Sequence, residues 1–120
     1  MLELKADLGV RTRKAYLAGN REILAAIAED YPENIRRLAV FHEAGFYQWH
    51  KENKPNGWEI QDARLGGLMQ RLKTCHKRLT AYLDGELDRI EELEEEILPW
   101  SGGEYIHCNS YTSIISRSPM

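Results

Sequence analysis

The most chemically varied cluster in the sequence surrounds a tryptophan that directly follows a turn at residues 53–57. Four residues of three chemical types make up this cluster: Trp58, Glu59, Asp62 and Arg64. An aromatic ring beside charged groups can bind a sugar, and paired carboxylates that converge in a concave site can act as acid and base. The alternative is a helix start with acidic residues in its first turn and with Trp58 packed on Trp49. The four residues are therefore candidate contacts with a substrate or with another domain, and none is assigned as catalytic.

Histidine and cysteine side chains are the next candidates, because both residue types bind zinc. The sequence holds four histidines and two cysteines: His42, His50, His76, His107, Cys75 and Cys108. They show no Cys-x-x-Cys or His-x-x-x-His spacing, and adjacent residues such as Cys75 and His76 point to different faces of a helix. We therefore expect no metal site and no cofactor. His42 falls on an apolar helix face and is interpreted as a partly buried histidine bonded to a neighbour.

An acidic stretch at residues 84–96 holds eight carboxylates, opposed only by Arg89. A calcium or magnesium site is one interpretation, but the stretch lacks the alternating oxygen ligands and the central glycine of a calcium loop. Its apolar residues recur at helical spacing: Leu87, Ile90, Leu93 and Ile97. The carboxylates are therefore expected on the solvent-facing side of a helix.

Motifs for nucleophilic catalysis and for phosphate binding are missing from the sequence. There is no Gly-x-Ser-x-Gly pattern, and no glycine-rich phosphate loop occurs. The adjacent Gly66 and Gly67 fall inside a predicted helix, where each costs about 1 kcal/mol relative to alanine. Two glycines tolerated there predict a close approach of another helix.

These residues are positioned by a pattern of apolar residues at steps of three and four, which is typical of amphipathic helices. Helices are predicted at residues 2–18, 21–29, 32–52, 60–83 and 87–98. The predicted breaks are Gly19-Asn20, Tyr31-Pro32, the turn at 53–57 and Asp84-Gly85. The fold class is therefore all-α, an antiparallel bundle of three long and two shorter helices, and its helical domain spans residues 1–100.

The last segment, residues 101–120, has a different residue pattern from the helical part. Tyrosines and isoleucines alternate loosely with polar residues after Gly102-Gly103, so a short extended or β arm is predicted. Such an arm offers strand edges to another chain, and a homodimer contact through it is expected.

Composition excludes several classes of function for the chain. Of its 120 residues, 42% are hydrophobic and 29% are charged, and the net charge is −3. A chain with this balance lacks the basic field that nucleic acid or anionic lipid requires, and no apolar run reaches the ~20 residues of a membrane span. Two cysteines in unrelated contexts favour a reducing cytoplasm.

Residues 2–18 are predicted to be helical from the start of the sequence, so Met1 is interpreted as a cloned or internal start of a longer protein.

Two segments resemble a known family. Residues 52–68 (ENKPNGWEIQDARLGGL) and residues 82–95 (YLDGELDRIEELEE) are similar to the helical region that follows the barrel in bacterial glycoside hydrolase family 20 proteins, the β-N-acetylhexosaminidases. Residues 4–13 (LKADLGVRTR) and the break at residues 30–32 fit the same region, so the resemblance covers roughly residues 1–100.

The resemblance implies a parent enzyme that removes terminal N-acetylhexosamine from glycans, with the substrate acetamido group as nucleophile and an adjacent Asp-Glu pair in acid–base catalysis. No Asp-Glu pair occurs in this chain, and a (β/α)8 barrel needs more than about 200 residues. The expected function is therefore that of a non-catalytic accessory domain whose partner is the catalytic barrel. A free-standing helical adaptor protein is the alternative.

Overall fold

The computed structural model describes residues 2–96, and every regular element within that range is a helix. The helices are α1 (Leu2–Lys5), α2 (Leu8–Leu17), α3 (Arg21–Glu52), α4 (Trp58–Leu83) and α5 (Glu91–Glu94). The prediction of an all-α fold is confirmed. The predicted arm at residues 101–120 lies outside the described residues.

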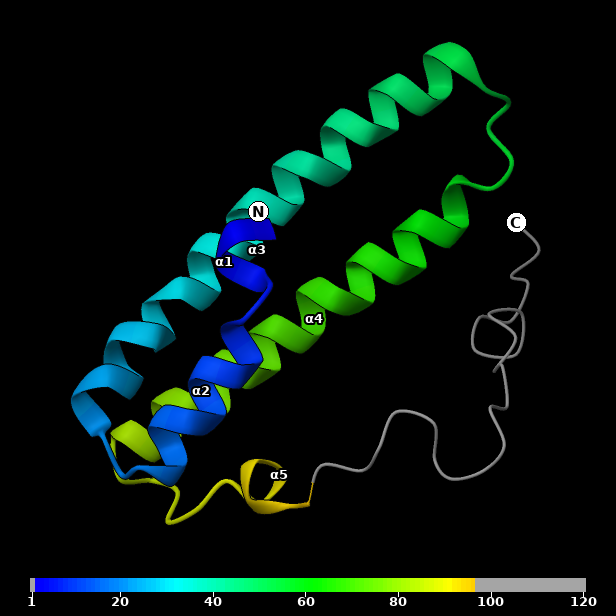
Figure 1. Cartoon of the computed structure of the whole chain (residues 1–120). Coiled ribbons are helices and arrows are strands. Elements are labelled where there is room, and N and C mark those ends of the chain that lie inside the picture. Colours follow the sequence, from blue (N-terminus) through cyan, green and yellow to red (C-terminus); the bar gives the residue numbers. More distant parts are fainter. Residues whose placement is uncertain (1, 97–120) are drawn as a thin grey trace, which may run out of the picture.

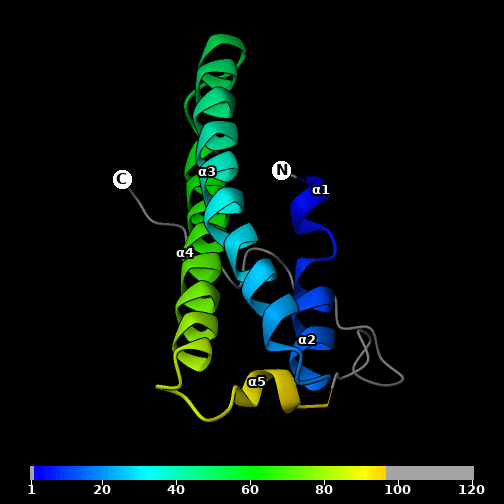
Figure 2. The same cartoon turned by 90° about the vertical axis from the view of Figure 1, so that its left-hand side faces the viewer.

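The architecture is a long helical hairpin with a second layer at one end. α3 and α4 run antiparallel and are joined by the turn at residues 53–57 (Figure 1). α1 and α2 lie along α3 only over the half farther from that turn, and α5 packs against α2 at the base of the hairpin (Figure 2). We call the end that carries α2 and α5 the base, and the end that carries the turn the tip.

Three of the four predicted breaks are confirmed, among them the turn at 53–57, which separates the end of α3 at Glu52 from the start of α4 at Trp58. α2 ends at Leu17 before Gly19, whose φ of 64° suits glycine, and the Asn20 side chain accepts a hydrogen bond from the Ile23 backbone N–H at 3.0 Å. α4 ends at Leu83, two residues before Gly85 with φ 79°.

The predicted break at Tyr31-Pro32 is wrong, because α3 continues through Pro32 for 32 residues in total. Proline removes one helical hydrogen bond and crowds the preceding turn. Burial on both sides of it offsets that cost: Tyr31 is 4% exposed and Leu38 is 1% exposed, both facing the hairpin interior. α3 is bent where it passes this region, as Figure 2 shows. The separate helices predicted at 21–29 and 32–52 are therefore one helix.

The outer predicted helices are both shorter than expected. The first is interrupted at Ala6-Asp7, where Arg11 donates hydrogen bonds to the Asp7 carboxylate (3.0 Å) and to Asp30 of α3 (2.9 Å). In the last, Ile90 donates its backbone N–H to the Tyr16 hydroxyl at 2.9 Å, so helix begins only at Glu91. The described residues thus hold two long helices, one of ten residues and two single turns, rather than three long and two shorter ones.

The core of the domain lies at the base. The most deeply buried apolar side chains there are Leu8, Leu24, Ile27, Ala28, Tyr31, Leu38, Leu79 and Ile90. Leu24 and Ile27 are buried, whereas Ile23 is 52% exposed. Ile23 lies one residue off the face of α3 that meets α2 and α4.

Gly66 and Gly67 do not mark a close helix contact, which corrects the prediction. A Cβ atom added at either position meets no heavy atom within 4 Å. The close approaches occur instead at Gly45 and Gly57, near the tip, where an added Cβ would lie 3.1 Å from the ring of Trp58 and 3.3 Å from the ring of Trp49, respectively.

Candidate functional site

A cluster of aromatic rings holds the tip together. Trp58, the first residue of α4, is 8% exposed and lies 5.2 Å from His42, 5.7 Å from Phe46 and 6.0 Å from both Trp49 and His50, measured between ring centroids. These separations fall in the range in which offset and edge-to-face pairs are attractive. The expectation that Trp58 packs on Trp49 is confirmed.

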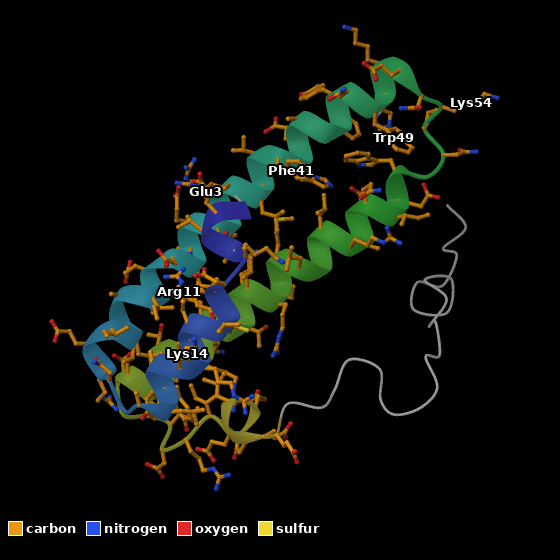
Figure 3. All side chains as sticks on the ribbon, viewed as in Figure 1. Glu3, Arg11, Lys14, Phe41, Trp49 and Lys54 are labelled. Atoms are coloured by element: carbon orange, nitrogen blue, oxygen red, sulfur yellow. The ribbon has the colours of Figure 1, made fainter. Side chains whose placement is uncertain are left out.

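Two glycines and one backbone bond set the positions of the tryptophans. Gly57 has φ 100°, a conformation that side-chain-bearing residues rarely adopt, and the Trp49 ring lies over it. Gly45 leaves the space that the Trp58 ring fills. Trp49 donates its indole N–H to the Lys54 carbonyl at 3.0 Å, which ties α3 to the turn (Figure 3). The two rings are therefore rigidly placed.

On one side of Trp58, the candidate carboxylates are engaged within the chain. Asp62 and the Nε2 atom of His42 are 2.6 Å apart, and the Gly57 backbone N–H donates to Glu59 at 2.7 Å. The interpretation of His42 as a partly buried histidine with a bonded neighbour is confirmed. Arg64 is exposed on α4 and also has an interaction partner. These carboxylates support the helix start and the ring cluster.

On the other side of Trp58 lies a cavity of about 290 Å³, which we call the tip pocket. Its lining comprises Phe41, Gly45, Gln48, Trp49, Glu52, Asn53, Trp58, Gln61 and Leu65. Figure 3 shows Trp49 close to the turn and Phe41 farther from it, near the middle of α3. Of the four residues selected from the sequence, only Trp58 lines this pocket.

The pocket residues that sequence reasoning missed are Gln48, Glu52 and Gln61. One signal for them was present: Gln48 and Glu52 follow Phe41 at steps of seven and eleven, which places all three on one flank of α3. The position of Gln61 opposite them depends on how α4 is aligned against α3, and the sequence alone does not give that alignment.

The tip pocket combines apolar walls with uncommitted polar groups. The side chains of Gln48, Glu52 and Gln61 make no hydrogen bond within residues 2–96. Trp58 is mostly buried, yet its indole N–H has no acceptor in the same range, and its nitrogen is not among the fully buried unpaired atoms. Small-molecule sites are typically such apolar concavities with a few convergent polar groups.

A second, larger groove of about 640 Å³ runs between α2 and α3 at the base. Its polar lining includes Arg11 and Asp30, which already pair with each other at 2.9 Å. Most of the remaining lining is aliphatic, including Ala18, Ile23 and Ala26. The groove therefore offers fewer free polar groups for a ligand than the tip pocket does.

The acidic stretch is more than a solvated helix face. The Tyr16 hydroxyl donates to Glu94 at 2.6 Å while it accepts from the Ile90 N–H, and burial followed by the Glu94 contact raises the pKa of Tyr16. Arg78 donates to both Glu91 (3.2 Å) and Glu92 (2.9 Å). These bonds hold the segment after α4 against α2 and α4.

Within residues 2–96, no three side chains of the His, Cys, Asp or Glu type converge as a metal site would need. The same range contains no helix that combines the length and the apolar character of a membrane span.

Fold and site together define a helical hairpin domain with an aromatic pocket at its tip. A family model described as the Glycoside Hydrolase 20C C-terminal domain matches residues 1–110. The chain belongs to this family, as the resemblance indicated. A search of curated proteins finds no match.

Proposed function

We propose that the chain is the non-catalytic C-terminal accessory domain of a family 20 β-N-acetylhexosaminidase, and that it packs on the catalytic barrel and stabilises it. The family match over residues 1–110 supports an accessory domain of this kind. The sequence holds no adjacent Asp-Glu pair, so the acid–base chemistry belongs to the barrel.

The observation that carries this proposal is the uncovered half of the hairpin. Beyond α1 and α2, α3 and α4 have no third element beside them within the described residues (Figure 1). Large apolar side chains are exposed there: Val40 (57%), Phe41 (52%), Tyr47 (66%) and Ile60 (39%). Two helices alone cannot bury all their apolar residues, and clustered exposed apolar residues mark interaction surfaces.

The course of α1 favours the barrel as the partner that covers this surface. Glu3 lies beside α3 between the levels of Arg11 and Phe41 (Figure 3), and the Arg11 side chain also approaches the Leu4 carbonyl at 3.5 Å. A catalytic domain joined ahead of α1 would therefore begin next to the exposed half of α3. Val40 and Tyr47 lie one above the other on the outward face of α3, so we assign the contact to them.

The test is binding of the purified chain to a family 20 catalytic barrel encoded in the same genome, measured by calorimetry and by the melting temperature of the barrel. We expect binding and a higher barrel melting temperature. The double variant Val40→Asp/Tyr47→Asp should weaken binding at least about tenfold because it places two charges in an apolar contact. Gln70→Asp, an exposed change on α4, is the matched control. The proposal is contradicted if the wild-type chain does not bind the barrel and does not change its melting temperature.

The reading frame around Met1 separates this function from the alternative of a free-standing adaptor. A frame that continues upstream into a barrel sequence with an Asp-Glu pair supports the accessory domain. A ribosome-binding site directly before Met1 supports the adaptor.

A further inference from the structure

We propose that the tip pocket is a saccharide subsite that accepts one neutral pyranose ring. The choice of a glycan as ligand rests on the proposed function, whereas the requirement for a neutral, polyhydroxylated ring follows from the lining of the pocket. In the parent enzyme, the domain would then contact the glycan as well as support the barrel.

The size of the pocket suits a single ring. Its volume of about 290 Å³ lies just below the range of about 300–1,000 Å³ that is typical of small-molecule sites. The rigidly held rings of Trp49 and Trp58 form part of the wall, so the pocket exists before a ligand arrives. Preformed walls lower the entropic cost of binding.

The charge of the lining excludes ionic ligands. No lysine or arginine lines the pocket, and Glu52 is its single charged side chain. A phosphate or another anion would therefore meet a carboxylate without a compensating cation. One exposed carboxylate also gives a cation little to bind, because ion pairs at exposed positions contribute about 0–1 kcal/mol.

The uncommitted polar groups exclude a purely apolar ligand. The carboxamides of Gln48 and Gln61 each donate and accept hydrogen bonds, Glu52 accepts, and the Trp58 indole N–H donates. An apolar ligand would remove these groups from water without giving them partners, which costs free energy. A pyranose satisfies both halves of the lining, because its C–H face packs on aromatic rings and each hydroxyl on its rim donates and accepts.

The test is an NMR titration of the full 120-residue chain with N-acetylglucosamine, and separately with methyl glucopyranoside and with inorganic phosphate. The indole N–H resonances of Trp49 and Trp58 and the carboxamide resonances of Gln48 and Gln61 report on the pocket directly. We expect saturable shifts of these resonances with one or both sugars and none with phosphate. Shifts with N-acetylglucosamine alone assign the subsite to an acetamido sugar, and shifts with both assign it to the pyranose ring.

The variant Gln48→Ala/Gln61→Ala should weaken sugar binding about tenfold or more, whereas Gln70→Ala on the exposed side of α4 should bind like the wild type. Both changes replace side chains that make no hydrogen bond within residues 2–96, so circular dichroism should show unchanged helicity. The proposal is overturned if the folded wild type shows no saturable shift up to about 50 mM sugar, a range that covers millimolar affinities. Equal shifts in the wild type and the double variant would also overturn it.

Barrel binding, measured on the same preparation, separates the two proposals. If the chain binds the barrel but its resonances do not shift on adding sugar, the saccharide subsite is rejected and the accessory function is retained. Sugar shifts without barrel binding remove the docking function and leave a saccharide-binding helical domain.

Discussion

The base and the tip of the hairpin are built from the same two helices, yet they are stabilised in different ways. At the base, α2 and the segment around α5 cover α3 and α4, and aliphatic residues such as Leu24 and Leu79 are almost fully buried. At the tip, no third element covers the hairpin within residues 2–96, and rings of tryptophan, phenylalanine and histidine fill the space between α3 and α4. Large rings let two helices bury one another's surface where no third layer exists.

This difference separates the role of folding from the role of recognition. A base with a closed core can specify the fold by itself. A tip that keeps Phe41 and Tyr47 exposed beside free carboxamides loses stability that a partner or ligand can restore. The comparison predicts that substitutions at the base affect unfolding, whereas substitutions at the tip affect binding.

The largest expected effect comes from a cavity in the buried part of α4. Leu72→Ala should lower the free energy of unfolding by about 2–5 kcal/mol, because Leu72 is 7% exposed and packs in the core cluster. Ile60→Ala, on the same helix at the tip, should cost less than about 1 kcal/mol, because Ile60 is 39% exposed. Urea denaturation followed by circular dichroism measures both, and equal losses would erase the distinction between base and tip.

The next effect tests the bond that closes the base. Tyr16→Phe removes the hydroxyl that donates to Glu94 and accepts from the Ile90 N–H, so it leaves a buried donor unpaired. The expected loss is about 1–3 kcal/mol. Tyr47→Phe at the tip is the control, because the exposed Tyr47 hydroxyl makes no hydrogen bond within residues 2–96, and its change should stay within about 0.5 kcal/mol. Hydrogen exchange at the Ile90 amide should rise in Tyr16→Phe alone.

A smaller effect is expected when two helical glycines, Gly66 and Gly45, are each replaced by alanine. Gly66→Ala should stabilise the chain by about 0.5–1 kcal/mol, because the site is helical and nothing lies within 4 Å of the added Cβ. Gly45→Ala gains the same helix preference but places a Cβ 3.1 Å from the Trp58 ring, which four other rings hold in place. We expect no net gain there. Thermal melts compare the two, and a stabilised Gly45→Ala would show that the ring cluster yields easily.

The smallest effect is electrostatic and lies between base and tip. Hydrogen bonds from Arg36 and then Arg37 lower the pKa of Glu33 from 4.5 to about 2. A carboxylate with a lowered folded-state pKa contributes stability above its unfolded pKa, and loses it as the pH falls from about 4.5 to about 2. Glu33→Gln should therefore be slightly less stable at pH 7 and should lose less stability across that interval. Because the Glu33 side chain is still 35% exposed to water, solvent screens the interaction and the difference will be small. The free energy of unfolding of the two proteins is measured as the pH is lowered. An equal loss in both proteins would contradict this assignment.

The sequence predicted the base better than the tip, for a physical reason. Leu72 and Leu79 are buried because apolar residues recur at helical spacing along one face of α4. That spacing can be recognised in the sequence without a structure. The break at Pro32 was mistaken because a local rule for proline competes with burial on both sides, and burial prevails. The tip pocket was missed because Gln48 and Gln61 resemble ordinary surface residues until the alignment of two helices places them together.

Pro32 also acts on the tip through simple leverage. The twenty residues that follow Pro32 in α3 span about 30 Å at 1.5 Å per residue. A change of about 10° in the bend of α3 therefore carries the end of the helix sideways by about 5 Å, which is comparable to the width of a sugar ring. The bend at Pro32, far from the pocket, therefore helps to set where the α3 wall of the tip pocket lies relative to the α4 wall.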